Sequence, residues 1–231
     1  MPIYGEYHFE TGDFSEWDGT EASGTGNSIA VSSVRAKAGT YSAKVHIESS
    51  GKARCYDYNI MDLGAGSNIW ASGWFFFPTG FDVDSGIHWA ILYPQQTGSP
   101  YQSIRVHIND AEELRVYNAL NAAWHDQASP IAVPLNEWVG IELYIYAHDT
   151  NGQIELWQNG GRIIEVSGID TMPSTNWSNL YAGCGYMGGT PSSTYEFWFD
   201  EIYLQDEQKI TPAVVQAIRL NPLGLRRFGG F

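Results

Sequence analysis

The strongest constraint on the fold is the near absence of helical periodicity before residue 205. Short runs of aromatic and β-branched residues alternate there with turn-forming residues. Because no part of the pattern indicates a strand–helix–strand unit, it favours an all-β, two-sheet antiparallel sandwich. About twelve strands are predicted, at residues 29–34, 41–48, 54–60, 69–77, 87–93, 101–108, 113–119, 137–147, 153–158, 162–166, 179–187 and 195–204.

Two stretches carry the residues of tight hairpin turns. The sequence NGG at residues 159–161 supplies the positive-φ residues that a two-residue hairpin loop needs, and HDTNGQ at 148–153 is a second such signal. The 25 glycines and 14 tyrosines also suit turn-rich β structure. We therefore predict one β-sandwich domain over residues 1–205 and a separate C-terminal arm over residues 206–231.

The charge balance restricts the partners. Twelve basic and 26 acidic side chains give a formal net charge of −14, which repels nucleic acid and anionic membranes. The same field disfavours a polyanionic substrate such as a uronic-acid polymer, whereas neutral sugars and divalent cations are not penalised. The chain has no apolar run of about 18 residues and no basic, apolar leader. We therefore expect neither a membrane span nor a secretory signal in it.

The two cysteines lie in segments that read as strands. Cys55 and Cys184 form no CxxC motif and no metal-ligand spacing. A disulfide between them is one reading, and two free thiols in the core is the favoured one.

Several predicted strands have a second face that is rich in aromatic and polar side chains. In residues 101–108, Arg105 and His107 alternate with an apolar face. Such a face suits sugar binding, because pyranose rings stack on aromatic rings and their hydroxyls need flanking donors and acceptors. The alternative is that a loop covers these aromatics as a second small core. The predicted sugar contacts are Tyr56, Arg105, His107, Tyr144, Tyr146 and Trp157.

Three motifs resemble the concanavalin A-like jelly rolls, a group that includes laminin-G-like domains, carbohydrate-binding modules and several polysaccharide lyases. They are FETGDFSEW near the start, AKAGTYSAKVHI, and YEFWFDEIYL as the final strand. The segments WASGWFFFPTGFD and NEWVGIELYIYA look most like the heparin-lyase-like branch. The resemblance covers roughly residues 7–205 and implies the fold, whereas this fold hosts many activities.

The resemblance also implies a structural calcium ion. In related carbohydrate-binding modules a Glu near the start and an Asp of the last strand bind calcium, which gives Glu10 and Asp200 here, with carbonyls near Gly12 and residues 37–39 as further ligands. Calcium prefers six to eight oxygen ligands, loop carbonyls included. The neighbouring acids Asp13, Glu16 and Asp18 are then interpreted as solvated loop residues. The alternative is an ordinary acidic loop without metal.

The evidence for catalysis is divided. A glycosidase needs two carboxylates across a groove, and the ExDxxE strand motif of laminarinase-type enzymes is absent. A lyase needs a group that neutralises the uronate, a base and an acid. The lyase-like branch shows R-x-E in an early strand, where this chain has Arg54, Cys55 and Tyr56, and YPQQTG lacks the expected His. These departures and the net charge favour a scaffold without lyase chemistry. The candidates for such chemistry would be Arg54, His88, Gln95, Gln96, Arg105, His107 and Tyr186.

The character of the chain changes after Leu204. Four of the twelve basic residues lie within residues 209–227, and TPAVVQAIRL is typical of a short helix with Thr211 as its N-cap. An extended arm follows, which we expect to dock against a neighbouring subunit or a larger shell; packing on its own sandwich is the alternative. The arm residues are Leu223, Leu225, Arg226, Arg227, Phe228 and Phe231.

Taken together, the sequence favours a non-catalytic surface or assembly protein. We expect a virion protein, such as a phage decoration, fibre or tail component, with a glycan-binding face. Its partners would be its own subunits or a protein shell, and a polysaccharide; its place would be a virion surface or an extracellular assembly. The alternatives are a polysaccharide lyase, a glycoside hydrolase or a free carbohydrate-binding module.

Overall fold

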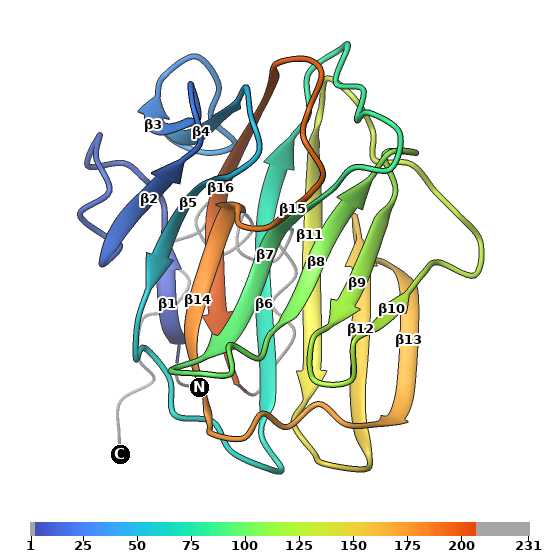
Figure 1. Ribbon diagram of the computed structural model, residues 1–231. Helices are drawn as coiled ribbons and strands as arrows, with labels where there is room; N and C mark the ends of the chain where they lie inside the picture. Colours follow the sequence, from blue (N-terminus) through green and yellow to red (C-terminus); the bar gives the residue numbers. More distant parts are fainter. Residues whose placement is uncertain (1–2, 207–231) are drawn as a thin grey trace, which may run out of the picture.

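The computed structural model describes residues 3–206, which form sixteen strands and no helix. The strands make two antiparallel sheets that pack face to face as a sandwich (Figure 1). The expected all-β jelly-roll fold is confirmed. No helix among these residues is long and apolar enough to cross a membrane. The predicted helix with Thr211 and the arm residues from Leu223 to Phe231 lie outside the described residues.

The first sheet, sheet A, has eight strands in the order β13-β12-β11-β6-β16-β4-β3, with β1 also paired to β16. Its final strand β16 lies in the middle of the sheet, between β6 and β4, as the long-range pairing of a jelly roll requires. The strands of sheet A are β1 Ile3–Tyr7, β3 Ser28–Ser32, β4 Ser42–Ile47, β6 Asn68–Phe76, β11 Trp138–Tyr146, β12 Gly152–Gln158, β13 Gly161–Ile169 and β16 Tyr195–Gln205.

The second sheet, sheet B, also has eight strands, in the order β10-β9-β8-β7-β14-β5-β2, with β15 paired to β7. It is the sheet in front in Figure 1, and its outer face carries the candidate site. The strands of sheet B are β2 Gly19–Ser23, β5 Lys52–Asp57, β7 His88–Gln96, β8 Ile104–Asn109, β9 Leu114–Asn118, β10 Ala123–His125, β14 Trp177–Cys184 and β15 Met187–Gly188.

The core lies between the two sheets and follows the alternation of the sequence. In β11 the apolar set from Val139 to Ile145 is fully buried, and in β16 Phe197 and Phe199 are fully buried. Burying each such side chain contributes about 1.5–3 kcal/mol, so these strands hold the sandwich together. Cys55 and Cys184 are buried and free.

The hairpin predicted at residues 159–161 is confirmed. It joins β12 to β13, and Asn159 and Gly160 have φ values of 50° and 79°. Two consecutive positive φ angles are those of a type I′ turn, whose twist matches that of the flanking strands. The second predicted turn joins β11 to β12.

The acidic N-terminal segment closes one edge of the sandwich. Trp17 stacks on Tyr7 with ring centroids 3.9 Å apart, and Phe9 is fully buried. The interpretation of Glu16 as a solvated acid is wrong, because its Oε2 accepts hydrogen bonds from the backbone N–H groups of His8 and Phe9 at 2.7 and 2.8 Å. Asp18 is exposed, yet it accepts a hydrogen bond from the backbone of Tyr58 at 2.8 Å. These carboxylates therefore anchor the segment.

Candidate functional site

A groove crosses the outer face of sheet B. It consists of two adjoining hollows of about 640 and 410 Å³, which share Arg105 and Tyr186. The larger hollow lies over β7, β14, β5 and the edge strand β2, and the smaller one over β7, β8, β9 and β10. The groove side chains therefore come from seven strands, of which β2, β5 and β14 are distant in the sequence from the consecutive strands β7 to β10.

The strand register places the groove side chains in rows. Arg105 on β8 lies opposite Tyr117 on β9, and Tyr93 on β7 lies opposite Tyr181 on β14. Tyr181 in turn lies opposite Tyr56 on β5. Because directly opposed residues in an antiparallel pair point to the same face, these side chains all project to the outer face.

A β-bulge in β7 decides which of its residues reach the groove. Simple alternation from His88 would place Tyr93 in the core with Trp89 and Ile91. The pairing register of β7 with β8 shifts between Ala90 and Leu92, and Leu92 is fully buried in the core. The bulge changes the face that the later residues present, so Tyr93 and also Gln95 line the larger hollow. Sequence reasoning missed Tyr93 for this reason.

Arg105 lies at the junction of the two hollows. Its guanidinium carbon is 5.0, 5.7 and 6.0 Å from the ring centroids of Tyr186, Tyr117 and Tyr93. Its Nε donates a hydrogen bond to Ser103 Oγ at 2.6 Å, and burial lowers the pKa of the guanidinium. Within residues 3–206 it forms no salt bridge, so its charge is available for an anionic ligand.

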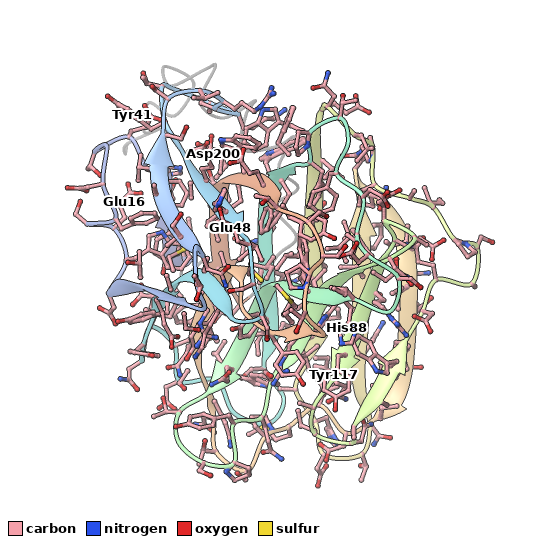
Figure 2. The ribbon with its side chains drawn as sticks, turned by 45° about the horizontal axis from the view of Figure 1, so that its top comes forward. Glu16, Tyr41, Glu48, His88, Tyr117 and Asp200 are labelled. Atoms are coloured by element: carbon pink, nitrogen blue, oxygen red, sulfur yellow. The ribbon has the colours of Figure 1, made fainter. Side chains whose placement is uncertain are left out.

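Two histidines line the smaller hollow. His88 and His107 have ring centroids 5.2 Å apart, and the ring of Trp124 lies 4.8 and 4.9 Å from them. Burial lowers the pKa of His107 well below its usual value, and burial together with Arg115 lowers the pKa of His88. These shifts favour the neutral form of both imidazoles, and of the two His88 is the one that is only half-buried. Figure 2 shows His88 and Tyr117 close together on this side of the molecule.

His107 is fully buried beneath the smaller hollow. Neither of its ring nitrogens has a hydrogen-bond partner among residues 3–206. A buried polar group without a partner is costly, about 1–3 kcal/mol, and is typical of a site whose function compensates the cost. The expectation that Arg105 and His107 share one face of their strand is confirmed.

Arg54 lies at the other side of the groove. It donates hydrogen bonds from Nε and Nη2 to Glu21 Oε2 at 3.0 and 2.6 Å, and from Nη1 to the hydroxyl of Tyr93. Lys52 Nζ lies 2.5 Å from Glu21 Oε1. Arg54 thus has a carboxylate partner on the neighbouring strand β2, although its own strand has no Glu two residues after it. Burial raises the pKa of Tyr93 to about 12, with Arg54 acting against that rise.

Besides Tyr186, five tyrosines line the larger hollow. The rings of Tyr93 and Tyr181 stack at 4.8 Å with an interplanar angle of 11°, and those of Tyr56 and Tyr58 stack at 4.5 Å. Tyr101 is 67% exposed at the rim. We call Tyr56, Tyr58, Tyr93, Tyr101 and Tyr181 the tyrosine platform. Sequence reasoning named only Tyr56 among them, because the others lie in a bulged strand, in a strand without polar alternation, or in loops.

The structure divides the predicted sugar contacts between two faces. Tyr56, Arg105 and His107 lie on the groove face of sheet B. The others, Tyr144, Tyr146 and Trp157, lie on the outer face of sheet A, on β11 and β12. Their role in sugar binding stays a prediction, and they do not belong to the groove.

The remaining lyase candidate, Gln96, does not line the groove. It is fully buried, and its Oε1 accepts hydrogen bonds from Ser174 Oγ and from the backbone and hydroxyl of Thr175 at 3.0–3.2 Å. It therefore ties the end of β7 to the segment before β14.

The proposed calcium ligands both contact the loop of residues 37–41. Glu10 accepts hydrogen bonds from the backbone N–H groups of Thr40 and Tyr41 at 2.9–3.0 Å, and Asp200 Oδ2 accepts from Lys37 and Ala38 at 2.8 and 3.2 Å. A calcium ion needs converging oxygen atoms, whereas these carboxylates face N–H donors. As arranged here the set does not fit the ion. Residues 3–206 also contain no group of three or more His, Cys, Asp or Glu side chains placed to hold a metal.

The charge of the groove is opposite to that of the whole chain. The larger hollow is lined by Lys52, Arg54 and Arg105 and by a single carboxylate, Glu21. The smaller hollow is lined by Arg105 and by no carboxylate. Low-dielectric walls concentrate such a local field, so the groove can attract an anion although the chain carries a net charge of −14.

The sequence matches the profile of a family described as polysaccharide lyase over residues 9–203. The chain therefore belongs to this polysaccharide lyase family. Its fold is similar to that of an endo-β-1,4-glucuronan lyase from the fungus Trichoderma reesei, with a TM-score of 0.65 and 14% identity over 86% of this chain and 93% of that one.

A second similar structure is the alginate lyase vAL-1 from Chlorella virus, with a TM-score of 0.63 and 13% identity over 89% of this chain and all of that one. At such identities the likeness shows the shared fold. A search among curated proteins gives no match.

The family match corrects the main functional prediction. The expectation of a non-catalytic virion surface or assembly protein is wrong, and a carbohydrate-active enzyme, the alternative, is supported instead. The missing Glu after Arg54 misled the sequence argument, because Arg54 pairs instead with Glu21 of the neighbouring strand β2. The global charge misled it as well, because the groove is locally basic.

Proposed function

We propose that this protein is an enzyme that cleaves a uronate-containing polysaccharide by β-elimination in the groove of sheet B. The observation that carries the proposal is Arg105, a half-buried cation with no carboxylate partner in residues 3–206, which lies among tyrosines and next to two histidines. Membership of the polysaccharide lyase family supports the reaction class.

Elimination from a uronate needs three groups. A cation binds the carboxylate and withdraws charge from it, which makes the proton on C5 more acidic. A base takes that proton, the electron pair forms the C4–C5 double bond, and the bond from C4 to the glycosidic oxygen breaks. An acid then protonates the leaving oxygen. Atoms and electrons balance without water or an added co-reactant.

The residues of the smaller hollow and its junction fit these roles. Arg105 would hold the carboxylate, since a guanidinium matches it in shape and charge. His88 is neutral and lines the hollow, so it would take the C5 proton. Tyr186 is 52% exposed and lines both hollows, so its hydroxyl would protonate the leaving glycosidic oxygen. His107, buried behind His88, would position it.

The test uses polyglucuronate and polymannuronate with the full chain. The expected product absorbs in the ultraviolet because of its C4–C5 double bond. Arg105→Ala, His88→Gln and Tyr186→Phe should each abolish most of this signal. Matched controls are Arg162→Ala and Tyr144→Phe on sheet A, which should retain it.

Three outcomes would overturn the proposal. New reducing ends without the unsaturated product would indicate a hydrolase. Binding of the polymers without cleavage would indicate a carbohydrate-binding protein. If the sheet A controls lose activity and the groove variants keep it, the site lies on the outer face of sheet A.

A further inference from the structure

The two sides of the groove differ in charge and in aromatic content: one carries the tyrosine platform and Glu21, and the other carries Arg105 and the histidines. This difference affects which sugars each side can bind. We propose that the tyrosine platform is a subsite for a sugar residue without a carboxylate, next to the uronate subsite at Arg105, and that Glu21 sets this preference. The inference rests on the proposed lyase function. It implies a substrate in which uronates adjoin uncharged sugars.

The aromatic geometry of the platform suits a sugar ring. Tyr56 and Tyr58 stack on each other, and the rings of Tyr58 and Tyr181 meet edge to face with centroids 6.0 Å apart. Tyr58 is 43% exposed, so one of its faces is open to a ligand. Aromatic faces bind the C–H groups of a pyranose, and phenol hydroxyls at their edges can bond its hydroxyl groups. None of these contacts requires a carboxylate on the sugar.

Both cations on this side already pair with a carboxylate of the protein. Glu21 accepts from Arg54 at 2.6 and 3.0 Å and lies 2.5 Å from Lys52. Partial burial raises the pKa of Glu21, but Lys52 and Arg54 outweigh burial and hold it below its usual value. Glu21 is therefore ionised at neutral pH and balances the charge of one of the two cations. A substrate carboxylate placed here would have to compete with it.

The uronate side is different. Arg105 has a hydroxyl and aromatic rings around it and forms no salt bridge within residues 3–206. The smaller hollow beside it contains no carboxylate in its lining. One side of the groove thus has an available cation, and the other has cations that an internal carboxylate engages.

The net charge of the chain favours the same substrate class. A polymer of contiguous uronates brings one negative charge with every residue, and a charge of −14 on the protein repels it. A polymer in which uncharged residues separate the uronates has a lower charge density and meets less repulsion. It still supplies the single carboxylate that Arg105 needs.

The experiment compares polyglucuronate with the same polymer after part of its carboxylates has been reduced to primary alcohols. The measured quantity is kcat/KM per remaining uronate, from the ultraviolet signal of the unsaturated product. We expect the wild type to favour the partly reduced polymer about threefold or more. Glu21→Gln should remove this preference by raising kcat/KM on the unreduced polymer about three- to fivefold. The reason is that Lys52 and Arg54 lose their internal carboxylate partner, and this partly screened charge can then bind a substrate carboxylate.

The matched control is Glu165→Gln. Glu165 lies on β13 of sheet A, is 48% exposed and pairs with Arg162 at 2.7 Å, so it resembles Glu21 in exposure and partner. This control should keep the wild-type preference. If Glu21→Gln fails to fold, Tyr58→Ala at the exposed rim provides a second test. It should lower kcat/KM about three- to tenfold on the partly reduced polymer and less on the unreduced one.

The outcomes separate the inference from the proposed function. If the unsaturated product forms but the wild type favours the unreduced polymer per uronate, the inference is wrong and the lyase function stands. The same holds if neither Glu21→Gln nor Tyr58→Ala changes the preference. If neither polymer gives an unsaturated product, the proposed function fails and the inference fails with it.

Discussion

The guanidinium carbon of Arg105 lies 5.0 Å from the centre of the Tyr186 ring, although Arg105 comes from β8 and Tyr186 from the loop between β14 and β15. This contact joins the two hollows of the groove. In the proposed mechanism, this cation beside a half-exposed phenol would give the groove a carboxylate-binding group and a proton donor at one point.

Replacement of Arg105 should affect catalysis more than folding. Arg105→Lys keeps the charge but loses the planar fork that matches a carboxylate. We expect kcat/KM on polyglucuronate to fall about 100-fold, the loss of about 3 kcal/mol of charge-assisted contact. Steady-state kinetics measure this, and an unchanged urea midpoint would show that the variant folds. Activity within twofold of wild type would exclude Arg105 as the carboxylate-binding group.

The acid side of the pH–rate profile should report His88. Burial and the charge of Arg115 lower its pKa, while Asp110 acts in the opposite direction and His107 lies beside it. A base works in its neutral form, so kcat/KM should rise with pH and level off below pH 6.5, the ordinary value of histidine.

Arg115→Gln removes a charge that lowers the pKa of His88, so the acid limb should move to higher pH. A profile of kcat/KM against pH for both proteins checks this. An acid limb that stays in place, or moves to lower pH, would contradict the assignment of His88 as the base.

His107 should make folding stability depend on pH. Its pKa is well below the ordinary value in the folded protein, mainly because of burial. As pH falls below about 6.5 the unfolded chain binds a proton that the folded chain does not, so stability is lost, at up to about 1.4 kcal/mol per pH unit for one group. Urea unfolding at a series of pH values should show a smaller slope for His107→Leu than for the wild type. Equal slopes would contradict this.

Glu10 should stabilise the protein by fixing the loop of residues 37–41. Its carboxylate accepts backbone hydrogen bonds from Thr40 and Tyr41, and Glu10→Ala removes them. We expect a loss of about 1–3 kcal/mol in the free energy of unfolding.

Thermal unfolding with and without calcium tests the prediction of a calcium site. Because Glu10 and Asp200 face N–H donors, we expect calcium and EDTA to leave the melting temperature of the wild type unchanged. A rise with calcium that Asp200→Asn abolishes would establish the calcium site that the sequence resemblance implies.

The two cysteines should be unreactive in the native protein. Cys55 and Cys184 are fully buried, and burial raises the pKa of Cys184 to about 12. The thiolate is the reactive form, so a thiol reagent should label neither residue until the chain is unfolded. Two thiols per chain should then react without a reductant. Failure to label them in denaturant would indicate a disulfide.

Much of the fold follows from the sequence. The alternation in residues 137–147 and 196–200 and the Asn-Gly turn at 159–160 depend on local backbone geometry, and the structure confirms each. After Asp200 a bulge breaks the alternation of β16. The strands that the pattern missed are short or polar, such as β10 at Ala123–His125 and β15 at Met187–Gly188. A strand of two or three residues is too short to show the two-residue alternation of apolar and polar side chains.

The sequence predicted the candidate site only in part. Arg105 and His107 were identified because they alternate cleanly within one strand. Tyr93 was not, because a bulge in β7 moved it from the expected core face to the groove. Tyr144, Tyr146 and Trp157 show the same surface pattern but lie on the other sheet, since alternation tells which residues share a face and not which sheet that face belongs to.

The sequence by itself therefore determined the class of fold, the core and the faces of the regular strands, because these depend on the period of two residues along a strand. Only the tertiary structure decided the site. It brought Glu21 of an edge strand to Arg54, left Arg105 without a carboxylate in residues 3–206, and made one face basic on an acidic chain. Pairing between strands distant in the sequence sets these relationships, and no local pattern encodes it.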